Sequence, residues 1–169
     1  MKLVQTPKKS LGQNFLIDKN IIDKIIKIEN INKNKMIVEI GAGYGNLTAA
    51  ISTLKPKKIF AIEKDKKLFS FLDNKFENHK NIKIINEDIL NIDLNKFTDY
   101  NKIVGNLPYY ITTPIIFKVL EYPFWDKIVF MVQKEVAARL TGKVCTKEYG
   151  LCRLAIICFV ASCNKFPDD

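Results

Sequence analysis

The segment Asn106-Leu107-Pro108-Tyr109 contains residue types that can hold the exocyclic amine of a nucleobase for reaction. Such an amine is a weak nucleophile because its lone pair is delocalised into the ring, and two acceptors placed on its two hydrogens orient it. The side-chain carbonyl of Asn106 and the backbone carbonyl of Leu107 can be these acceptors, and Pro108 restrains the local turn. Tyr109 offers a flat face on which an extruded base can stack, a contact worth about 1–3 kcal/mol. The segment therefore predicts chemistry at the amino group of adenine, for which no strong general base is needed.

A glycine-rich segment, Glu39-Ile40-Gly41-Ala42-Gly43-Tyr44-Gly45, lies between a predicted strand and a predicted helix. Glycine lets the backbone turn sharply and approach a ligand, and the amino end of the following helix favours a negative or electron-rich group. A dinucleotide-binding fingerprint has the spacing G-x-G-x-x-G, whereas the third glycine here comes one position earlier. Gly41 and Gly43 are therefore predicted to contact a ligand that needs no phosphate.

Two acidic residues, Glu63 and Asp88, follow the next two predicted strands. Ligands of α/β proteins bind at the carboxyl edge of the sheet, where Glu63 can accept from both hydroxyls of a ribose and Asp88 from the amino group of adenine. The structural alternatives are an exposed glutamate in a lysine-rich loop and an aspartate that caps a helix. Together with the glycines, these carboxylates predict a nucleoside-containing cofactor without a phosphate requirement, and S-adenosyl-L-methionine fits best.

Apolar runs and helical stripes alternate along the chain and must position these residues. The spacing predicts helices over residues 18–31, 46–54, 65–76, 113–120 and 134–140, and strands over residues 36–40, 58–62, 82–85, 102–104 and 128–132. The strands are continuously apolar, as expected when helices cover both faces of a sheet. The pattern predicts an α/β fold with a doubly wound, mostly parallel sheet. Residues 149–161 are apolar enough for a further buried helix or strand.

Length and charge limit the kind of protein. The 169 residues suffice for one domain with a buried core, which we place at residues 1–169. The net charge of +9 favours a polyanionic partner, nucleic acid before an acidic membrane face, although a general richness in Lys, Ile and Asn explains part of it. No apolar run reaches the roughly 20 residues of a membrane span, and residues 1–11 lack the apolar core of a secretory signal. We therefore expect a cytoplasmic protein without a membrane partner.

Metal and thiol chemistry are not predicted. The cysteines form no C-x-x-C pair, and the one histidine, His79, lies in a polar run far from them in sequence. We expect a solvated histidine and reduced thiols packed near a C-terminal helix. The cysteines are Cys145, Cys152, Cys158 and Cys163.

These motifs together resemble a known family, the ribosomal RNA adenine dimethyltransferases of the bacterial KsgA type. The resemblance runs from about Lys9 to Gly150. Its landmarks are Leu11-Gly12-Gln13-Asn14-Phe15-Leu16, residues 39–45, Glu63, Asp88, residues 105–114 and residues 131–140. It implies a Rossmann-like class I methyltransferase fold. It also implies that S-adenosyl-L-methionine is contacted by Asn14, Leu16, Gly41, Glu63, Asp88 and Asn106.

The same resemblance implies a substrate. Two adjacent adenosines near the 3′ end of small-subunit rRNA would each be methylated twice at N6, within a late assembly intermediate of the pre-30S type, and we expect a monomer. Members of the family continue beyond the point at which this sequence ends. We therefore expect incomplete C-terminal strands and no C-terminal helical domain that grips rRNA. The stretch Tyr149-Gly150-Leu151-Cys152-Arg153-Leu154 also departs from the family pattern.

Three other functions remain as alternatives. The related Erm family methylates large-subunit rRNA, but residues 133–137 and the leucine of Asn-Leu-Pro-Tyr resemble the small-subunit enzymes more closely. The basic charge also suits an RNA-binding assembly factor whose catalysis is secondary or absent. A nicotinamide-dependent dehydrogenase is disfavoured by the early third glycine and by the lack of a catalytic His, Tyr-Lys or Cys constellation.

Overall fold

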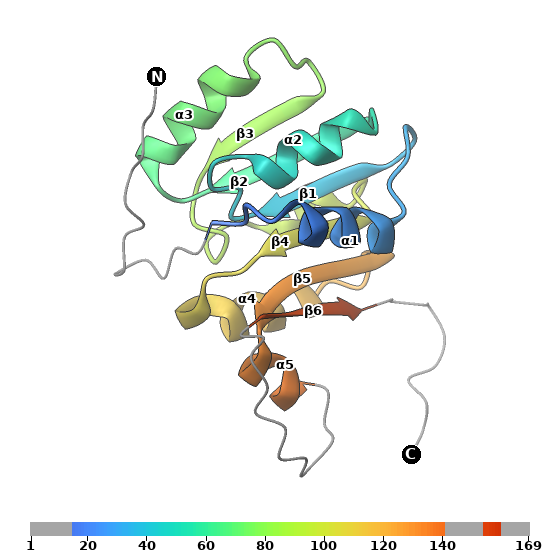
Figure 1. Ribbon diagram of the computed structural model, residues 1–169, viewed down its shortest axis with the longest axis vertical. Coiled ribbons are helices and arrows are strands. Elements are labelled where there is room, and N and C mark those ends of the chain that lie inside the picture. The colour runs from blue at the N-terminus through green and yellow to red at the C-terminus, as the bar shows by residue number, and fades with distance from the viewer. Residues whose placement is uncertain (1–14, 141–153, 160–169) are drawn as a thin grey trace.

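A computed structural model describes residues 15–140 and 154–159 (Figure 1). They form one six-stranded sheet in the order β3-β2-β1-β4-β5-β6, in which β1 to β5 are parallel and β6 is antiparallel to β5. The strands are β1 (Met36–Ile40), β2 (Lys58–Glu63), β3 (Ile82–Asn86), β4 (Lys102–Asn106), β5 (Lys127–Gln133) and β6 (Leu154–Phe159). The α-helices are α1 (Lys19–Glu29), α2 (Asn46–Thr53), α3 (Lys66–Phe76), α4 (Thr112–Leu120) and α5 (Lys134–Leu140), and η2 (Leu94–Phe97) and η3 (Tyr109–Ile111) are short 3-10 helices. The predicted doubly wound, mostly parallel α/β sheet is confirmed.

The predicted helix or strand over residues 149–161 is a strand where the structure describes it, since residues 154–159 form β6 along the edge of β5. Our expectation of incomplete later strands concerns the chain outside the described residues. Of the four cysteines, only Cys158 lies in a described element, the strand β6. None of the helices among the described residues combines the length and apolar character needed to cross a bilayer.

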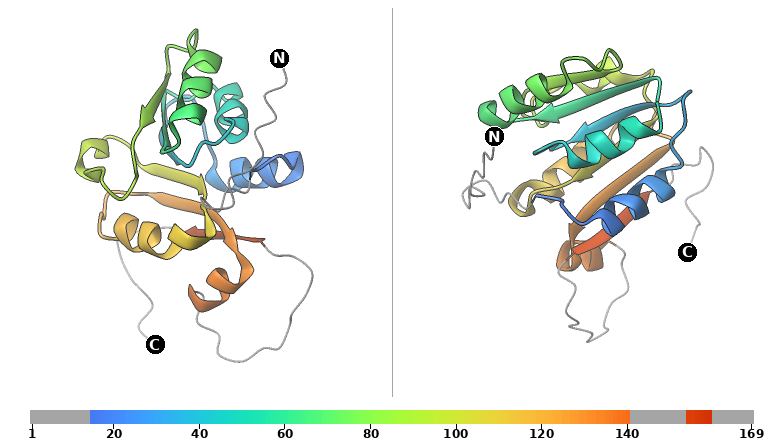
Figure 2. Two further views of the ribbon diagram at one scale, coloured as in Figure 1. Left: turned by 90° about the vertical axis from the view of Figure 1, so that its left-hand side faces the viewer. Right: turned by 45° about the horizontal axis from the view of Figure 1, so that its top comes forward.

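Helices pack on both faces of the sheet, which explains why the parallel strands are apolar throughout. Successive strand residues point to opposite faces, so each strand contributes to two cores. The left view of Figure 2 shows α1, α2 and α3 on one side of the sheet and η2 and α4 on the other. The first side is held by a cluster that includes Ile22, Ile25, Leu47, Ile51, Ile37, Ile59, Val104 and Val129. The second side is held by a cluster that includes Phe97, Ile115, Ile116, Val119, Val38, Ile103, Ile128 and Phe130.

Helix α1 is fixed at both ends, which anchors the residues that precede it. Asp18 caps its amino end by accepting from the Asn20 N–H at 2.8 Å, as predicted. At its carboxyl end, the buried ammonium of Lys102 donates to the Glu29 carbonyl and lies 3.0 Å from the Glu29 carboxylate. Burial raises the pKa of Glu29 to about 7, although the charge of Lys102 opposes the rise. These contacts tie the carboxyl end of α1 to the start of β4.

Candidate functional site

A cavity of about 250 Å³ opens at the carboxyl edge of the sheet, where β1, β2 and β4 end. Many of its lining residues are ones that the sequence predicts: Leu16, Gly41, Gly43, Glu63, Asp88, Asn106, Leu107 and Pro108. It did not single out Glu39, Asn46, Lys64 and Tyr110, which line the same cavity. Asn14 lies outside the described residues. Tyr109 belongs to η3 and is 58% exposed, and it is not among the lining residues.

Close approach of β4 to β1 brings the two predicted motifs together. A Cβ atom at Gly105 would lie 2.7 Å from the Ile40 carbonyl oxygen, nearer than two such atoms can pack, so the two strands meet only over a glycine. One residue further, a Cβ atom at Gly41 would lie 3.5 Å from the Asn106 carbonyl oxygen. The glycine loop and the start of the Asn-Leu-Pro-Tyr segment are therefore neighbours at the base of the cavity.

Three N–H groups of the glycine loop are hydrogen-bonded within the protein. The N–H groups of Gly41 and Ala42 donate to the Ile62 carbonyl at 2.9 and 3.3 Å, and that of Gly43 donates to the Glu63 carboxylate at 2.9 Å. Gly41 and Gly43 have φ angles of 72° and 59°, which side chains rarely tolerate. A phosphate-binding loop instead points free N–H groups at its ligand. The loop geometry therefore agrees with the prediction of a ligand that needs no phosphate.

Glu63 is held rigidly in the cavity wall. Its Oε2 accepts from the Gly43 N–H at 2.9 Å and its Oε1 from the Asp65 N–H at 2.8 Å, and the residue is only 7% exposed. Burial raises the pKa of Glu63, while the two backbone hydrogen bonds act in the opposite direction. Each carboxylate oxygen can accept more than one hydrogen bond, so both keep capacity for a ligand hydroxyl. Glu63 is thus a fixed acceptor and not the exposed loop residue that was the alternative.

Glu39 is a second buried carboxyl group in the cavity lining. It is 1% exposed, and the Thr48 hydroxyl donates to its Oε2 at 2.6 Å. Burial raises the pKa of Glu39 to about 8, the hydrogen bond from Thr48 opposes this, and the charge of Glu63 adds to it. Glu39 is therefore mostly protonated at neutral pH.

Asp88 already has partners on both oxygens. The Leu90 N–H donates to Oδ1 at 3.0 Å within a turn, and the Lys64 ammonium lies 2.7 Å from Oδ2. Burial alone would raise the pKa of Asp88, but the hydrogen bonds from Lys64 and Leu90 and the charge of Lys64 lower it below its usual range. Asp88 lines the cavity. The alternative of a helix cap is wrong, because no helix begins there and the next helix, η2, is capped by Asp93.

The Asn-Leu-Pro-Tyr segment is fixed through its backbone. The Leu107 N–H donates to the Met131 carbonyl at 3.0 Å, which ties the segment to β5. The Pro108 carbonyl accepts from the Thr112 hydroxyl at 2.7 Å and from the Ile111 N–H at 3.3 Å. The Leu107 N–H and the Pro108 carbonyl are thus both hydrogen-bonded within the protein, and these bonds fix the backbone conformation of the segment beside the cavity.

The residues that precede α1 lie against the glycine loop. The Asn46 side chain donates to the Leu16 carbonyl at 2.8 Å. The centres of the Phe15 and Tyr44 rings lie 4.4 Å apart. A Cβ atom at Gly43 would lie 3.2 Å from the nearest carbon of the Phe15 ring. Leu16 therefore lies in the cavity wall, and its contact with S-adenosyl-L-methionine stays a prediction.

The remaining polar candidates lie elsewhere. His79 follows α3, and its ring meets that of Phe76 edge-on at 5.4 Å, outside the cavity lining. In the part of the chain that the structure describes, no group of three or more His, Cys, Asp or Glu side chains is placed to hold a metal ion.

Comparison with known proteins agrees with this geometry. A model of the family "Ribosomal RNA adenine dimethylase" matches residues 4–162. "Ribosomal RNA small subunit methyltransferase A" of Caldanaerobacter subterraneus subsp. tengcongensis is 41% identical over 150 residues, which are 85% of this chain and 56% of that protein. The protein of the same name from Streptococcus thermophilus (strain ATCC BAA-491 / LMD-9) is 43% identical over 160 residues, 89% of this chain and 54% of the relative. The chain thus spans about half the length of the curated relatives it matches.

Solved structures share the fold. A dimethyladenosine transferase from Plasmodium falciparum has a TM-score of 0.69 and 31% identity, over 78% of this chain and 47% of that one. The 23S rRNA methyltransferase ErmE has a TM-score of 0.75 at 22% identity, over 92% and 73% of the two chains. An RNA methyltransferase from Salinibacter ruber in complex with S-adenosyl-L-homocysteine has a TM-score of 0.67 at 12% identity, over 92% and 98%. The Rossmann-like methyltransferase fold predicted from the sequence is confirmed.

Proposed function

Because this chain belongs to the ribosomal RNA adenine dimethylase family, we propose that it transfers methyl groups from S-adenosyl-L-methionine to N6 of adenosine in small-subunit rRNA. The observation that carries the proposal is one cavity lined by Glu63, Asp88 and the Asn106 segment. The proposed target is a pair of adjacent adenosines near the 3′ end of that RNA, each methylated twice, in a pre-30S particle. We further propose that the chain acts as a monomer in the cytoplasm, where such particles assemble.

The charge of the cavity supports this cofactor. Besides the largely protonated Glu39, four acidic residues line it, Glu63, Asp65, Glu87 and Asp88, against the single ammonium of Lys64. Such a lining favours a ligand with a net positive charge and disfavours a pyrophosphate. S-adenosyl-L-methionine is a cation with a ribose and an adenine, whereas the cofactor of a dehydrogenase carries two phosphates. When bound, it supplies an electrophilic methyl group.

In our proposal, different residues bind different parts of the cofactor. Glu63 holds the ribose hydroxyls with the lone pairs that Gly43 and Asp65 leave free. Asp88 accepts from the adenine amino group, and the ammonium of Lys64 competes with that group for the lone pairs of Oδ2. Leu16, Gly41, Gly43 and Asn106, together with Asn14, complete the proposed contacts.

The Asn106 segment orients the substrate amine. The Asn106 side-chain carbonyl and the Leu107 backbone carbonyl accept its two hydrogens, since the Pro108 carbonyl is engaged by Thr112 and Ile111. In this proposal the ring of Tyr109, which is exposed, stacks on a base arriving from solvent. Transfer would form the N6–CH3 bond as the S–CH3 bond of the cofactor breaks, with S-adenosyl-L-homocysteine as the leaving group. The positive charge on N6 would make one amine proton acidic, and that proton would pass to water.

Methyl transfer from labelled S-adenosyl-L-methionine to immature small subunits tests the proposal. Replacement of Asn106 by Ala is expected to lower transfer at least about 100-fold, as loss of a residue that orients the reacting group does. The affinity for S-adenosyl-L-homocysteine, which Asn106 is expected to contact as one of several residues, should fall much less. Asn95→Ala, an exposed substitution in η2, is the matched control and should transfer normally. Cofactor binding without transfer to any rRNA substrate would contradict the proposed activity.

A further inference from the structure

Lysines gather at the amino edge of the sheet, the end opposite the cavity. They lie in the three loops that lead into β1, β2 and β3 and in the first residues of β2 and β3, where lysine fills seven of the eleven positions in residues 33–35, 55–58 and 80–83. The group, called here the amino-edge patch, comprises Lys33, Lys35, Lys55, Lys57, Lys58, Lys80 and Lys83. A general richness in lysine would spread these charges over all loops, so their concentration in three neighbouring loops calls for a local explanation.

The three loops are bonded to one another, so the patch is one continuous surface. The Lys57 N–H donates to the Lys35 carbonyl at 2.9 Å, which joins the loops before β1 and β2. The Asn81 side chain donates to the Pro56 carbonyl at 3.1 Å, and the Ile59 N–H donates to the Asn81 carbonyl at 2.8 Å, which joins the loops before β2 and β3. These bonds fix the spacing of the lysines that the loops carry.

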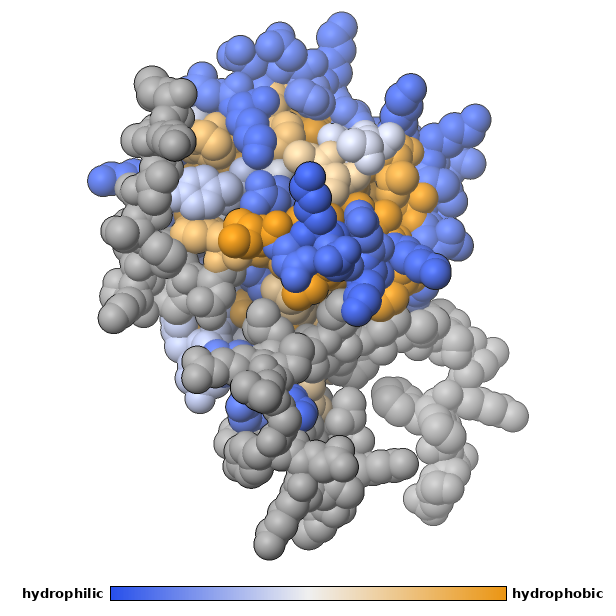
Figure 3. Space-filling model, viewed as in Figure 1, coloured by the Kyte–Doolittle hydropathy of each residue, from blue (hydrophilic) through white to orange (hydrophobic). Residues whose placement is uncertain are grey.

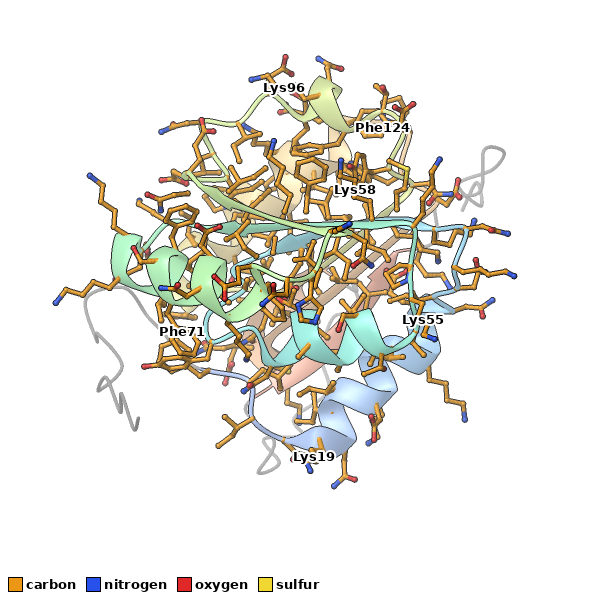
Figure 4. All side chains as sticks on the ribbon, turned by 90° about the horizontal axis from the view of Figure 1, so that it is seen from above. Lys19, Lys55, Lys58, Phe71, Lys96 and Phe124 are labelled. Carbon is orange, nitrogen blue, oxygen red and sulfur yellow. The ribbon has the colours of Figure 1, made fainter. Side chains whose placement is uncertain are left out.

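Two patch lysines are also held by an aromatic ring. Lys83 pairs with Phe60 across β2 and β3, and the ammonium groups of Lys58 and Lys83 lie 5.3 and 5.6 Å from the centre of the Phe60 ring. A cation over a ring face is restrained without being neutralised. Figure 4 shows Lys55 and Lys58 in the right-hand half of the molecule and Phe71, which packs on the cavity loop, in the left-hand half.

The charge of the patch is largely uncompensated. Within the described residues, Lys35 is the only patch lysine in an ion pair, with Asp126 at 3.9 Å. Hydrophilic residues gather along the upper and right-hand margins of the face viewed in Figure 3, the side on which these loops lie in Figure 1. The cavity edge has the opposite character, because carboxylates outnumber ammonium groups there.

We propose that the amino-edge patch is a second RNA-binding surface, which contacts the phosphate backbone of an RNA segment other than the one that presents the target base. This proposal rests on the proposed function, since a polyanionic substrate needs a cationic surface that the acidic cavity does not supply. Along β2, from Lys58 to Glu63, the two edges are about 17 Å apart at the rise of a strand. A folded RNA or a ribosomal particle can span that distance with two separate segments.

RNA fits the patch better than a membrane does. Asn32 and Asn34 stand between the lysines and are exposed, and amide side chains bind phosphates and sugar hydroxyls. Peripheral membrane binding usually adds apolar side chains that enter the bilayer. In the described loops around the patch, the only large apolar side chain counted as exposed is Leu54, at 36%.

The test compares two triple variants of the full chain with equal loss of charge. The patch variant carries Lys55→Gln, Lys57→Gln and Lys83→Gln; the control carries Lys19→Gln, Lys24→Gln and Lys27→Gln on the exposed side of α1. Affinity for a short fluorescein-labelled RNA hairpin is measured by anisotropy between about 50 and 200 mM salt. We expect the patch variant to bind about tenfold more weakly at low salt and to lose about two from the slope of log affinity against log salt, at 0.7–0.9 per phosphate contact. The control should change by about twofold or less.

Equal weakening in both variants, or none in either, would overturn the proposal. So would loss of binding to phosphatidylserine-containing vesicles by the patch variant while its binding to the hairpin is retained, an outcome that assigns the patch to membranes. Titration with S-adenosyl-L-homocysteine should give the same affinity in both variants, which reports on folding. Failure of methyl transfer in the wild type refutes the proposed function but leaves this RNA comparison unaffected, so the two failures are distinguishable.

Discussion

Burial of Glu39 should make the stability of the fold strongly dependent on pH. Its pKa is raised by burial from 4.5 to about 8, so the folded chain holds the proton more tightly than the unfolded chain. Below pH 4.5 both states are protonated and the group costs nothing. As pH rises toward 8, folding requires either proton uptake or a buried charge, so stability falls. At about 1.4 kcal/mol per unit, the loss reaches about 3 kcal/mol at pH 7 and at most about 5 kcal/mol above pH 8.

The substitution Glu39→Gln isolates this effect, because an amide has the same shape, can accept from the Thr48 hydroxyl and does not titrate in this range. The free energy of unfolding is measured by urea titration from pH 5 to 9, followed by the fluorescence of Trp125, the one tryptophan of the chain, which is 1% exposed. We expect the two proteins to be similarly stable at pH 5 and the variant to be more stable by several kcal/mol at pH 8.

Glu29 provides the internal control for that experiment. Burial raises its pKa to about 7, so it contributes a decline in stability over a lower pH range to both proteins. The difference between wild type and Glu39→Gln removes this shared decline. Parallel stability curves at every pH would refute the reasoning, since they would mean that Glu39 titrates normally in the folded state.

Two further predictions concern the contacts that shape the cavity. Lys64→Met removes the ammonium paired with Asp88, so affinity for S-adenosyl-L-homocysteine at low salt should rise about two- to fivefold, the range of an exposed ion pair, and depend less on salt. Calorimetric titration with Lys67→Met as the control checks this, and weaker binding by Lys64→Met would show that the ammonium assists the ligand. Gly105→Ala places a methyl group 2.7 Å from the Ile40 carbonyl oxygen and should lower the free energy of unfolding by about 1–3 kcal/mol. An unchanged urea midpoint would show that β4 can move away from β1 without cost.

Local sequence patterns predicted the fold because the signals that define a helix or a strand, its cap and the spacing of its apolar residues, lie within a few residues of one another. Asp18 caps the helix that the spacing of Ile22 and Ile25 predicts, and the apolar run 36–40 forms a strand buried on both faces. The prediction that a ligand binds at the carboxyl edge of the sheet follows from the same local information, since the residues that follow successive parallel strands lie at one edge.

Contacts between distant segments could not be predicted in this way. Lys64 meets Asp88 only because Ile62 pairs with Ile85 in the register of β2 and β3, and no spacing rule links positions 64 and 88. Lys102 and Glu29, separated by 73 positions, meet through the packing of α1 on the sheet. Tyr110, not Tyr109, lines the cavity because neighbouring residues of a 3-10 helix point about 120° apart.

The opposite charges of the two edges bear on how one small domain handles two different ligands. A cavity rich in carboxylates attracts a cationic cofactor and repels phosphates, so electrostatic attraction for RNA has to come from other surfaces. The amino-edge patch supplies positive charge at a distance from the cavity, where it does not weaken cofactor binding. The two affinities should then respond to salt differently. RNA binding falls steeply as salt rises, whereas the salt dependence of cofactor binding should be smaller and come mainly from the competition between Lys64 and the cofactor for Asp88. A domain arranged in this way can release its RNA at a salt concentration at which its cofactor site remains occupied.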